Sequence, residues 1–254
     1  MKIVRFTTDG KDRYGILKGN TVREIEGKPF RHIKETENSY QLNDVKLLAP
    51  CAPTKIIALG LNYHEHAKEL GMAVPSSPLT FLKPSTAVVG HEEHIEYPSS
   101  SARVDYEGEL AVVIKKSAWR VAVKDVPEYI LGYTCFNDIT ARDLQYSDAQ
   151  WTRAKGFNTF AAVGPWIETE LDPGNLSVET YLNGKLKQKG NTSDLIYSVA
   201  DIINFISHVM TLLPGDIIAT GTPPGVGPMY PGDTVEVRIK SIGTLRNSVI
   251  ENGA

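Results

Sequence analysis

Short apolar runs separated by turn residues recur along this chain, a pattern that predicts a β-rich protein with few helices. Short strands are expected at 2–6, 14–17 and 21–25, with turn residues between them. A polar, weakly patterned stretch covers 31–44, and a new apolar run begins just after residue 50. We therefore predict a small N-terminal β unit over residues 1–50 and a larger domain over 51–254.

Helical spacing of apolar residues is clear in one segment, 198–211, and residues 125–132 predict a second, short helix. Two Pro-Gly-Asp turns precede apolar strands expected at 217–220 and 234–239. Strands and helices do not alternate regularly, which argues against a doubly wound or barrel α/β fold. The pattern instead indicates a β-rich α+β fold.

The segment 105–114, Asp-Tyr-Glu-Gly-Glu-Leu-Ala-Val-Val-Ile, reads as a strand with apolar residues on both faces. Successive strand side chains point to opposite faces, so Glu107 and Glu109 lie side by side. Two carboxylates this close and partly out of water repel one another and lose hydration. A hard divalent cation with oxygen ligands resolves both costs, which makes this segment a candidate metal site.

Composition is that of an ordinary globular protein of 254 residues, with 41% hydrophobic and 22% charged residues. The formal net charge of -3 gives no electrostatic reason to expect nucleic acid or an acidic membrane surface as a partner. Two cysteines in apolar surroundings, Cys51 and Cys135, favour a reducing compartment without a disulfide framework. We expect a cytoplasmic protein, because no stretch resembles a signal peptide or a membrane span.

Two further segments carry residues that suit the paired acids. If a helical turn begins at 62–63, His66 and Glu69 lie three residues apart on one side, where a carboxylate orients an imidazole as a general base. The alternative is a surface contact on an amphipathic turn. Asp138 stands where an apolar strand gives way to polar residues, and suits either a third metal ligand or a turn. The nearby Arg142 and Gln145 suit substrate contacts or a solvated helix face.

A lysine and a glycine-rich loop complete the candidates. Lys155 precedes a glycine among aromatic residues, where a cation can stabilise an oxyanion, although it can also be an ordinary lysine extending to solvent. In the loop 219–227, Thr222 offers a hydroxyl and an amide to an anion, and a tight turn between strands is the alternative. The histidines of 91–94 lie in a polar segment that reads as a solvated loop.

These segments together resemble the fumarylacetoacetate hydrolase family over residues 50–250. The matching strings are GLNYHEHAKE (60–69), FLKP (81–84), DYEGEL (105–110), NDITARDLQ (137–145), KGFNTF (155–160) with VGP (163–165), and GTPPGVG (221–227). The first fifty residues also resemble a small β extension that some bacterial members carry. Asn158 departs from the pattern, since Asp is usual there.

The resemblance implies stacked mixed sheets with few short helices, a homodimer, and a site for Mg²⁺ or Mn²⁺. The family's metal ligands match Glu107, Glu109 and Asp138, in agreement with the strand argument. The family's mobile His–Glu dyad corresponds to His66 and Glu69, and its active-site lysine to Lys155. Its threonine, which receives a substrate carboxylate, corresponds to Thr222. Its glutamine corresponds to Gln145, and a lysine near the pocket to Lys83.

The activity implied is cleavage of a C–C bond in a small 2-oxo acid of the acylpyruvate type, through an enolate stabilised by the metal. The same chemistry without water gives an oxaloacetate-type decarboxylase, and proton transfer alone gives a 2-hydroxyhepta-2,4-diene-1,7-dioate isomerase of aromatic catabolism. A different class, a β-rich binding scaffold with a structural metal, is the remaining alternative. The catalytic residue types beside the acids argue against the scaffold.

Overall fold

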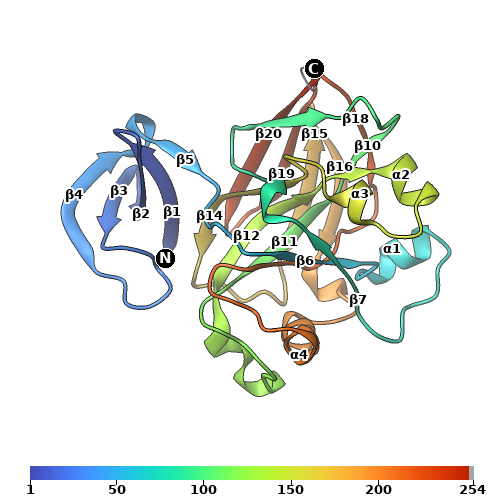
Figure 1. Ribbon diagram of the computed structural model, residues 1–254, viewed down its shortest axis with the longest axis horizontal. Coiled ribbons are helices and arrows are strands. Elements are labelled where there is room, and N and C mark those ends of the chain that lie inside the picture. Colours follow the sequence, from blue (N-terminus) through green and yellow to red (C-terminus); the bar gives the residue numbers. More distant parts are fainter. Residues whose placement is uncertain (252–254) are drawn as a thin grey trace.

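The computed structural model describes residues 1–251, and strands dominate it (Figure 1). Three sheets, one large and two small, account for most of the regular structure. Four α-helices and four 3-10 helices, all of eleven residues or fewer, connect the strands in this part of the chain. The prediction of a β-rich α+β fold with stacked mixed sheets is confirmed.

The largest sheet has twelve strands and runs through the whole molecule. In sheet order its main path is β4 (Glu35–Gln41), β3 (Thr21–Ile25), β2 (Lys11–Lys18), β1 (Lys2–Thr8), β14 (Ala161–Glu168), β12 (Ile130–Asp138), β11 (Gly108–Ile114), β17 (Ile217–Ala219), β6 (Ile56–Gly60) and β7 (Leu79–Lys83). Two short strands join it from the side: β5 (Lys46–Leu48) pairs with β1, and β8 (Val88–Val89) pairs with β14.

The first five strands, from the segment predicted to be a separate N-terminal unit, share this sheet with later strands. Strand β1 pairs antiparallel with β14, so the first strands extend the sheet outward and stand to the left in Figure 1. Strand β4 lies in the stretch that we expected to be unpatterned. Most of its side chains are exposed, so it lacks the apolar alternation that marks a strand in sequence.

The two smaller sheets complete the layers. The five-stranded sheet has the order β16 (Lys185–Asn191), β15 (Ser177–Leu182), β19 (Thr234–Ile239), β20 (Gly243–Glu251) and β9 (His94–Tyr97). The three-stranded sheet is β13 (Thr140–Ala141), β10 (Val104–Tyr106) and β18 (Gly227–Met229). Strand β11 is buried on both faces, because Leu110 and Val112 join one apolar cluster while Ala111 and Val113 join another.

The helices are short and lie at the edges of the sheets (Figure 1). The α-helices are α1 (His64–Glu69), α2 (Arg142–Ser147), α3 (Thr152–Lys155) and α4 (Val199–Val209). The 3-10 helices are η1 (Leu42–Asp44), η2 (Ser85–Ala87), η3 (Val123–Tyr129) and η4 (Thr192–Asp194). Helix α4 agrees with the predicted 198–211, and a capping box of Ser198 and Asp201 fixes its start. In residues 1–251, none of the helices is both long and apolar enough to cross a membrane.

The helix expected at 125–132 is only partly present. Residues Val123–Tyr129 form the 3-10 helix η3, and residues 130–132 already belong to strand β12. Pro127 supplies no backbone N–H to an α-helical ladder. Gly132 packs against the neighbouring strand, where an added Cβ would lie 2.4 Å from the carbonyl oxygen of Glu168.

The strand predicted over 105–114 is interrupted at Glu107, which corrects the sequence interpretation. Strands β10 and β11 lie on either side of the break and belong to different sheets. Side chains take the place of strand partners here. The N–H of Glu107 donates to Oδ1 of Asn137, and the N–H of Gly108 donates to Oε1 of Gln188, both at 2.9 Å. This break lies at the candidate metal site.

Candidate metal centre

Three carboxylates that are distant in sequence meet at one end of the β11–β12 pair. Glu107, Glu109 and Asp138 each offer an oxygen within 4.8 Å of the others, and their exposed fractions are 7%, 0% and 0%. The strand register explains the meeting, because Gly108 pairs with Asn137 and the N–H of Asp138 donates to the carbonyl of Glu107 at 2.8 Å. Within residues 1–251 this is the one group of acidic, histidine or cysteine side chains so arranged.

Buried cations accompany two of these carboxylates. Nζ of Lys155 donates to Oε2 of Glu107 at 2.9 Å and to Oδ2 of Asp138 at 2.6 Å. Nζ of Lys83 contacts the other oxygen of Asp138 and donates to the carbonyl of Ile139 at 3.1 Å. Burial lowers the pKa of Lys83 to about 8, although Asp138 opposes this change. Burial also acts to lower the pKa of Lys155, but Asp138 and Glu107 outweigh it and raise that pKa.

Glu107 and Glu109 have opposite electrostatic surroundings. Burial alone would raise the pKa of Glu107, but the positive charges of Lys155 and Arg142 outweigh it and bring that pKa to about 2. The pKa of Glu109 is raised well above its ordinary value by burial and by the neighbouring Asp138 and Glu107 carboxylates. Among residues 1–251 Glu109 has no ion pair, and its Oε2 accepts the N–H of Gly221 at 2.7 Å. One carboxylate of the cluster is therefore left uncompensated.

The residues fit a hard divalent cation. Oε1 of Glu109 is buried and has no hydrogen-bond partner among residues 1–251. A buried carboxylate oxygen without a partner is costly, and coordination to a positive ion removes that cost. All three donor groups are carboxylates. This ligand type suits Mg²⁺ and Mn²⁺, whereas softer metals favour sulfur ligands.

Arg142 and Gln145, predicted as substrate contacts, bind each other and the cluster in this structure. Nη1 of Arg142 donates to Oε1 of Gln145 at 2.6 Å, and its Nε donates to Oδ2 of the fully buried Asp105 at 2.9 Å. Its Nη2 reaches Oε1 of Glu107 at 2.5 Å. Arg142 thus holds the Glu107 carboxylate in place.

The predicted His–Glu pair forms on helix α1. Nδ1 of His66 lies 2.9 Å from Oε2 of Glu69, and His66 is 8% exposed. The Glu69 carboxylate also accepts the N–H of Gly225 at 3.1 Å. Gly225 and Gly221 belong to one loop, so this loop contacts both the helix with His66 and the carboxylate of Glu109.

Thr222 lies in that loop, and its hydroxyl is already engaged. Oγ1 of Thr222 donates to the carbonyl of Gly108 at 2.9 Å and accepts from Nε2 of Gln188 at 2.8 Å. We did not single out Gln188 from the sequence. The signal available was weak: a lone glutamine among alternating lysines, on the inward face of an otherwise solvated strand.

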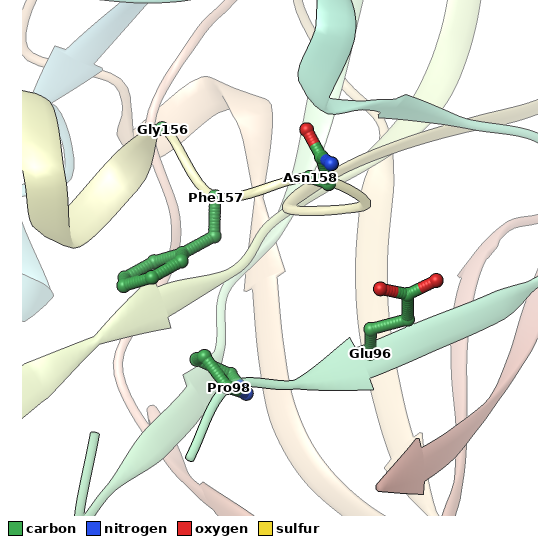
Figure 2. A pocket seen from close by; sticks show the side chains of 5 residues that line it. All are labelled: Glu96, Pro98, Gly156, Phe157 and Asn158. Atoms are coloured by element: carbon green, nitrogen blue, oxygen red, sulfur yellow. The ribbon is translucent and has the colours of Figure 1, made fainter. Parts of the chain in front are cut away.

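A cavity of about 310 Å³ is lined in part by the residues that follow Lys155, and Glu107, Glu109 and Asp138 do not line it. Figure 2 shows its lining residues, which are Glu96, Pro98, Gly156, Phe157 and Asn158. Asn158, which departs from the family pattern, is exposed there, and the ring of Phe157 points away from it. The histidines of the 91–94 segment contact strand β20 instead of the carboxylates: His91 Nδ1 accepts the N–H of Arg246, and His94 contacts Ser248.

Comparisons with known proteins support one family. A family model described as fumarylacetoacetate (FAA) hydrolase C-terminal matches residues 55–250, and one described as Rv2993c-like, N-terminal matches residues 1–50. A solved structure of 5-carboxymethyl-2-hydroxymuconate delta-isomerase from Mycobacterium smegmatis has a TM-score of 0.95 and 42% identity, covering 99% of this chain and 100% of that one.

Two further proteins with other reactions in their names are also similar. Oxaloacetate tautomerase YisK from Bacillus subtilis is 42% identical over 83% of this chain and 75% of its own length. The structure of maleylpyruvate hydrolase from Sphingobium sp. SYK-6, in complex with manganese(II) and pyruvate, has a TM-score of 0.84 and 31% identity, with 100% of both chains covered.

Proposed function

The chain belongs to the fumarylacetoacetate hydrolase family, and we propose that it is a divalent-metal-dependent enzyme that cleaves a C–C bond in a small 2-oxo acid. The family members named in the comparisons include isomerases, a tautomerase and hydrolases. The observation that carries the proposal is the uncompensated, buried Glu109 oxygen within the carboxylate cluster. The loop that contacts Glu109 also contacts Glu69, the partner of His66.

Glu107, Glu109 and Asp138 would hold the ion, which we propose to be Mg²⁺ or Mn²⁺. When bound there, such an ion supplies positive charge that polarises a 2-oxo carboxylate. The charges of the surrounding residues suit an anionic substrate. Lys83, Lys155 and Arg142 pair with Glu107 or Asp138, so Glu109 is the carboxylate left for the ion to neutralise. The rest of the ion's positive charge would then be available to the substrate.

His66 is the general base of this proposal. Glu69 contacts its Nδ1, which leaves Nε2 as the ring nitrogen available to take a proton. In hydrolysis, Nε2 removes a proton from a water molecule whose oxygen attacks the distal carbonyl carbon. The bond between that carbon and C3 of the pyruvyl part then breaks, and the pair of electrons stays on the pyruvyl part as its enolate. Protonation of the enolate gives pyruvate, and the acyl part leaves as a carboxylic acid.

Lys155 and Thr222 assist by position in this reaction. The buried ammonium of Lys155 keeps a positive charge near the oxygens on which the enolate charge develops. The loop of Thr222 lies against the strand with Glu109 and would receive the substrate carboxylate. We assign Lys83 to holding Asp138, and Gln145 to supporting Arg142.

The second candidate is proton transfer without cleavage, as in a tautomerase or isomerase. It is favoured by the names of relatives at about the same identity, 42%, over most of the chain. A His66 that takes a proton from C3 instead of from water would perform it with the same residues. Decarboxylation of an oxaloacetate-type diacid needs the enolate but no activated water.

The direct test is an assay of the purified protein with Mn²⁺ or Mg²⁺ on acetylpyruvate, fumarylpyruvate, oxaloacetate and 2-hydroxyhepta-2,4-diene-1,7-dioate. Release of pyruvate from an acylpyruvate supports the proposal. Isomerisation of the dienedioate or tautomerisation of oxaloacetate, without any cleavage, replaces it by the second candidate, and release of CO2 from oxaloacetate alone indicates a decarboxylase. His66→Ala should lower hydrolysis by about 10²- to 10⁴-fold and decarboxylation much less. Equal losses would contradict the role of His66 in activating water. A scaffold with a structural metal would show no turnover before or after metal removal.

We also propose a homodimer, which the family resemblance implies. Light scattering on the purified chain would give twice the monomer mass of 27.9 kDa. A single monomer mass at all concentrations would reject it.

A further inference from the structure

Gln188 is a buried amide on a strand whose neighbouring side chains are solvated. It lies on β16 and is 1% exposed, while Lys187 and Lys189 on either side are exposed. It is 80 residues away in sequence from Gly108, the residue between Glu107 and Glu109. A polar side chain buried this deeply is normally hydrogen-bonded, and the identity of its partners indicates which segments it connects.

The side chain of Gln188 forms three hydrogen bonds beside the candidate metal centre. Its Oε1 accepts the N–H of Gly108 at 2.9 Å, and its Nε2 donates to Oγ1 of Thr222 at 2.8 Å and to the carbonyl of Pro223 at 2.9 Å. The hydroxyl of Thr222 donates back to the carbonyl of Gly108 at 2.9 Å. These bonds close a ring between Gly108, at the start of the strand that contains Glu109, and the loop that contains Thr222.

The ring fixes which donor of Thr222 remains for a ligand. The threonine hydroxyl has one proton, and it is given to Gly108. The backbone N–H of Thr222 has no acceptor among residues 1–251. The donor left for an anion is therefore this backbone N–H, and its position depends on where Gln188 holds the loop.

We propose that Gln188 is a positioning residue that sets the Thr222 loop against the carboxylate cluster and so directs the Thr222 N–H to the substrate carboxylate. The inference rests on the proposed function for the identity of the ligand as a 2-oxo acid. An amide is required at this position, because glutamate could accept from Gly108 but could not donate to Pro223. A glutamate would also bring a negative charge beside the place of the substrate carboxylate.

Two variants and one control test this role. Gln188→Glu keeps the contact with Gly108, Gln188→Ala removes every contact, and Lys187→Ala is the control on the same strand. We expect KM for the 2-oxo acid to rise about tenfold or more in both Gln188 variants, while the Kd of Mn²⁺ stays within about threefold. Lys187→Ala should leave both constants unchanged. The separation of KM from the Kd of Mn²⁺ distinguishes positioning of the loop from general loss of structure.

Two results would overturn the inference: a KM in both Gln188 variants within about twofold of the parent, or an equal rise of KM and the Kd of Mn²⁺. If the parent chain turns over none of the four substrates, the proposed function fails, and hydrogen exchange then decides the role of Gln188 alone. Faster exchange of the segment 219–229 in Gln188→Ala than in Lys187→Ala would support it. Equal exchange rates would reject it.

Discussion

Nζ of Lys155 lies 2.6 Å from Oδ2 of Asp138, and both side chains are buried. The same ammonium group is 2.9 Å from Glu107. Lys155 therefore forms ion pairs with two of the three proposed metal ligands inside the protein. A buried charge that loses its partner destabilises the fold strongly. A bound divalent ion and Lys155 should accordingly substitute for one another, in part, as partners of these carboxylates.

The first prediction follows from this substitution. Lys155→Met should lower the free energy of unfolding of the metal-free protein by about 3–5 kcal/mol, because Glu107 and Asp138 lose a buried cation. Added Mn²⁺ should raise the melting temperature of the variant more than that of the parent. Thermal unfolding with EDTA and with Mn²⁺ measures both effects. Lys185→Met, at an exposed position on β16, is the control, and an equal loss of stability with and without Mn²⁺ would contradict the prediction.

The second prediction distinguishes the role of Glu109 in metal binding from its effect on the stability of the fold. Glu109→Gln keeps the shape of the side chain and an oxygen for the N–H of Gly221, but removes a charge that burial makes costly. Without metal, the variant should melt at or above the temperature of the parent. Its affinity for Mn²⁺ should fall by about 100-fold or more, with turnover lost. Undiminished metal-dependent activity would reject Glu109 as a ligand.

The third prediction concerns pH. Burial and the neighbouring Asp138 and Glu107 raise the pKa of Glu109, so the metal-free fold keeps this proton into a pH range where the unfolded chain has lost it. The free energy of unfolding of the metal-free protein should fall as pH rises from the ordinary carboxyl range toward the raised pKa. An ion needs the carboxylate form, so binding must release this proton.

Affinity for Mn²⁺ should consequently increase with pH, by up to about tenfold per unit below the raised pKa of Glu109. Calorimetric titrations in two buffers with different enthalpies of protonation count the released protons. Glu109→Gln provides the comparison, because this residue then has no proton to lose. A parent chain that binds Mn²⁺ without releasing protons would show that Glu109 is already ionised.

The sequence predicted the parts of this molecule that rest on local patterns. Helix α4 has clear 3.6-residue spacing, and strand β19 alternates apolar and polar residues, so both were expected. Strands β1, β2 and β3 were expected as short apolar runs between turn residues. The pairing of Glu107 with Glu109 was also expected from strand geometry. The two side chains do not lie on one continuous strand, however, since the strand breaks at Glu107.

What the sequence could not predict depends on partners that are distant along the chain. The break at Glu107 is made by the side chains of Asn137 and Gln188, and nothing near residue 107 indicates them. Arg142 has the same spacing from Gln145 whether it faces solvent, a substrate or Glu107. The fold decides among these, because Asp105 and Glu107 occupy the guanidinium group.

The last prediction concerns Arg142 as a support for Glu107. The planar guanidinium group contacts Asp105 through Nε and Glu107 through Nη2, a geometry that a lysine ammonium cannot reproduce. Arg142→Lys should therefore leave Glu107 less fixed and weaken Mn²⁺ binding by about 10- to 100-fold, as other residues that orient metal ligands do.

If Arg142 contacts the substrate instead, the same variant should raise KM and leave the Kd of Mn²⁺ unchanged. Arg153→Lys, an exposed arginine on helix α3 paired with Asp148, is the control for the chemical change itself. Manganese titrations and steady-state kinetics on the two variants measure these constants. A larger Kd for Mn²⁺ in Arg142→Lys, with no change in Arg153→Lys, would indicate that Arg142 holds Glu107 in place. Arg142 is the arginine of the two that joins a proposed metal ligand to the buried Asp105.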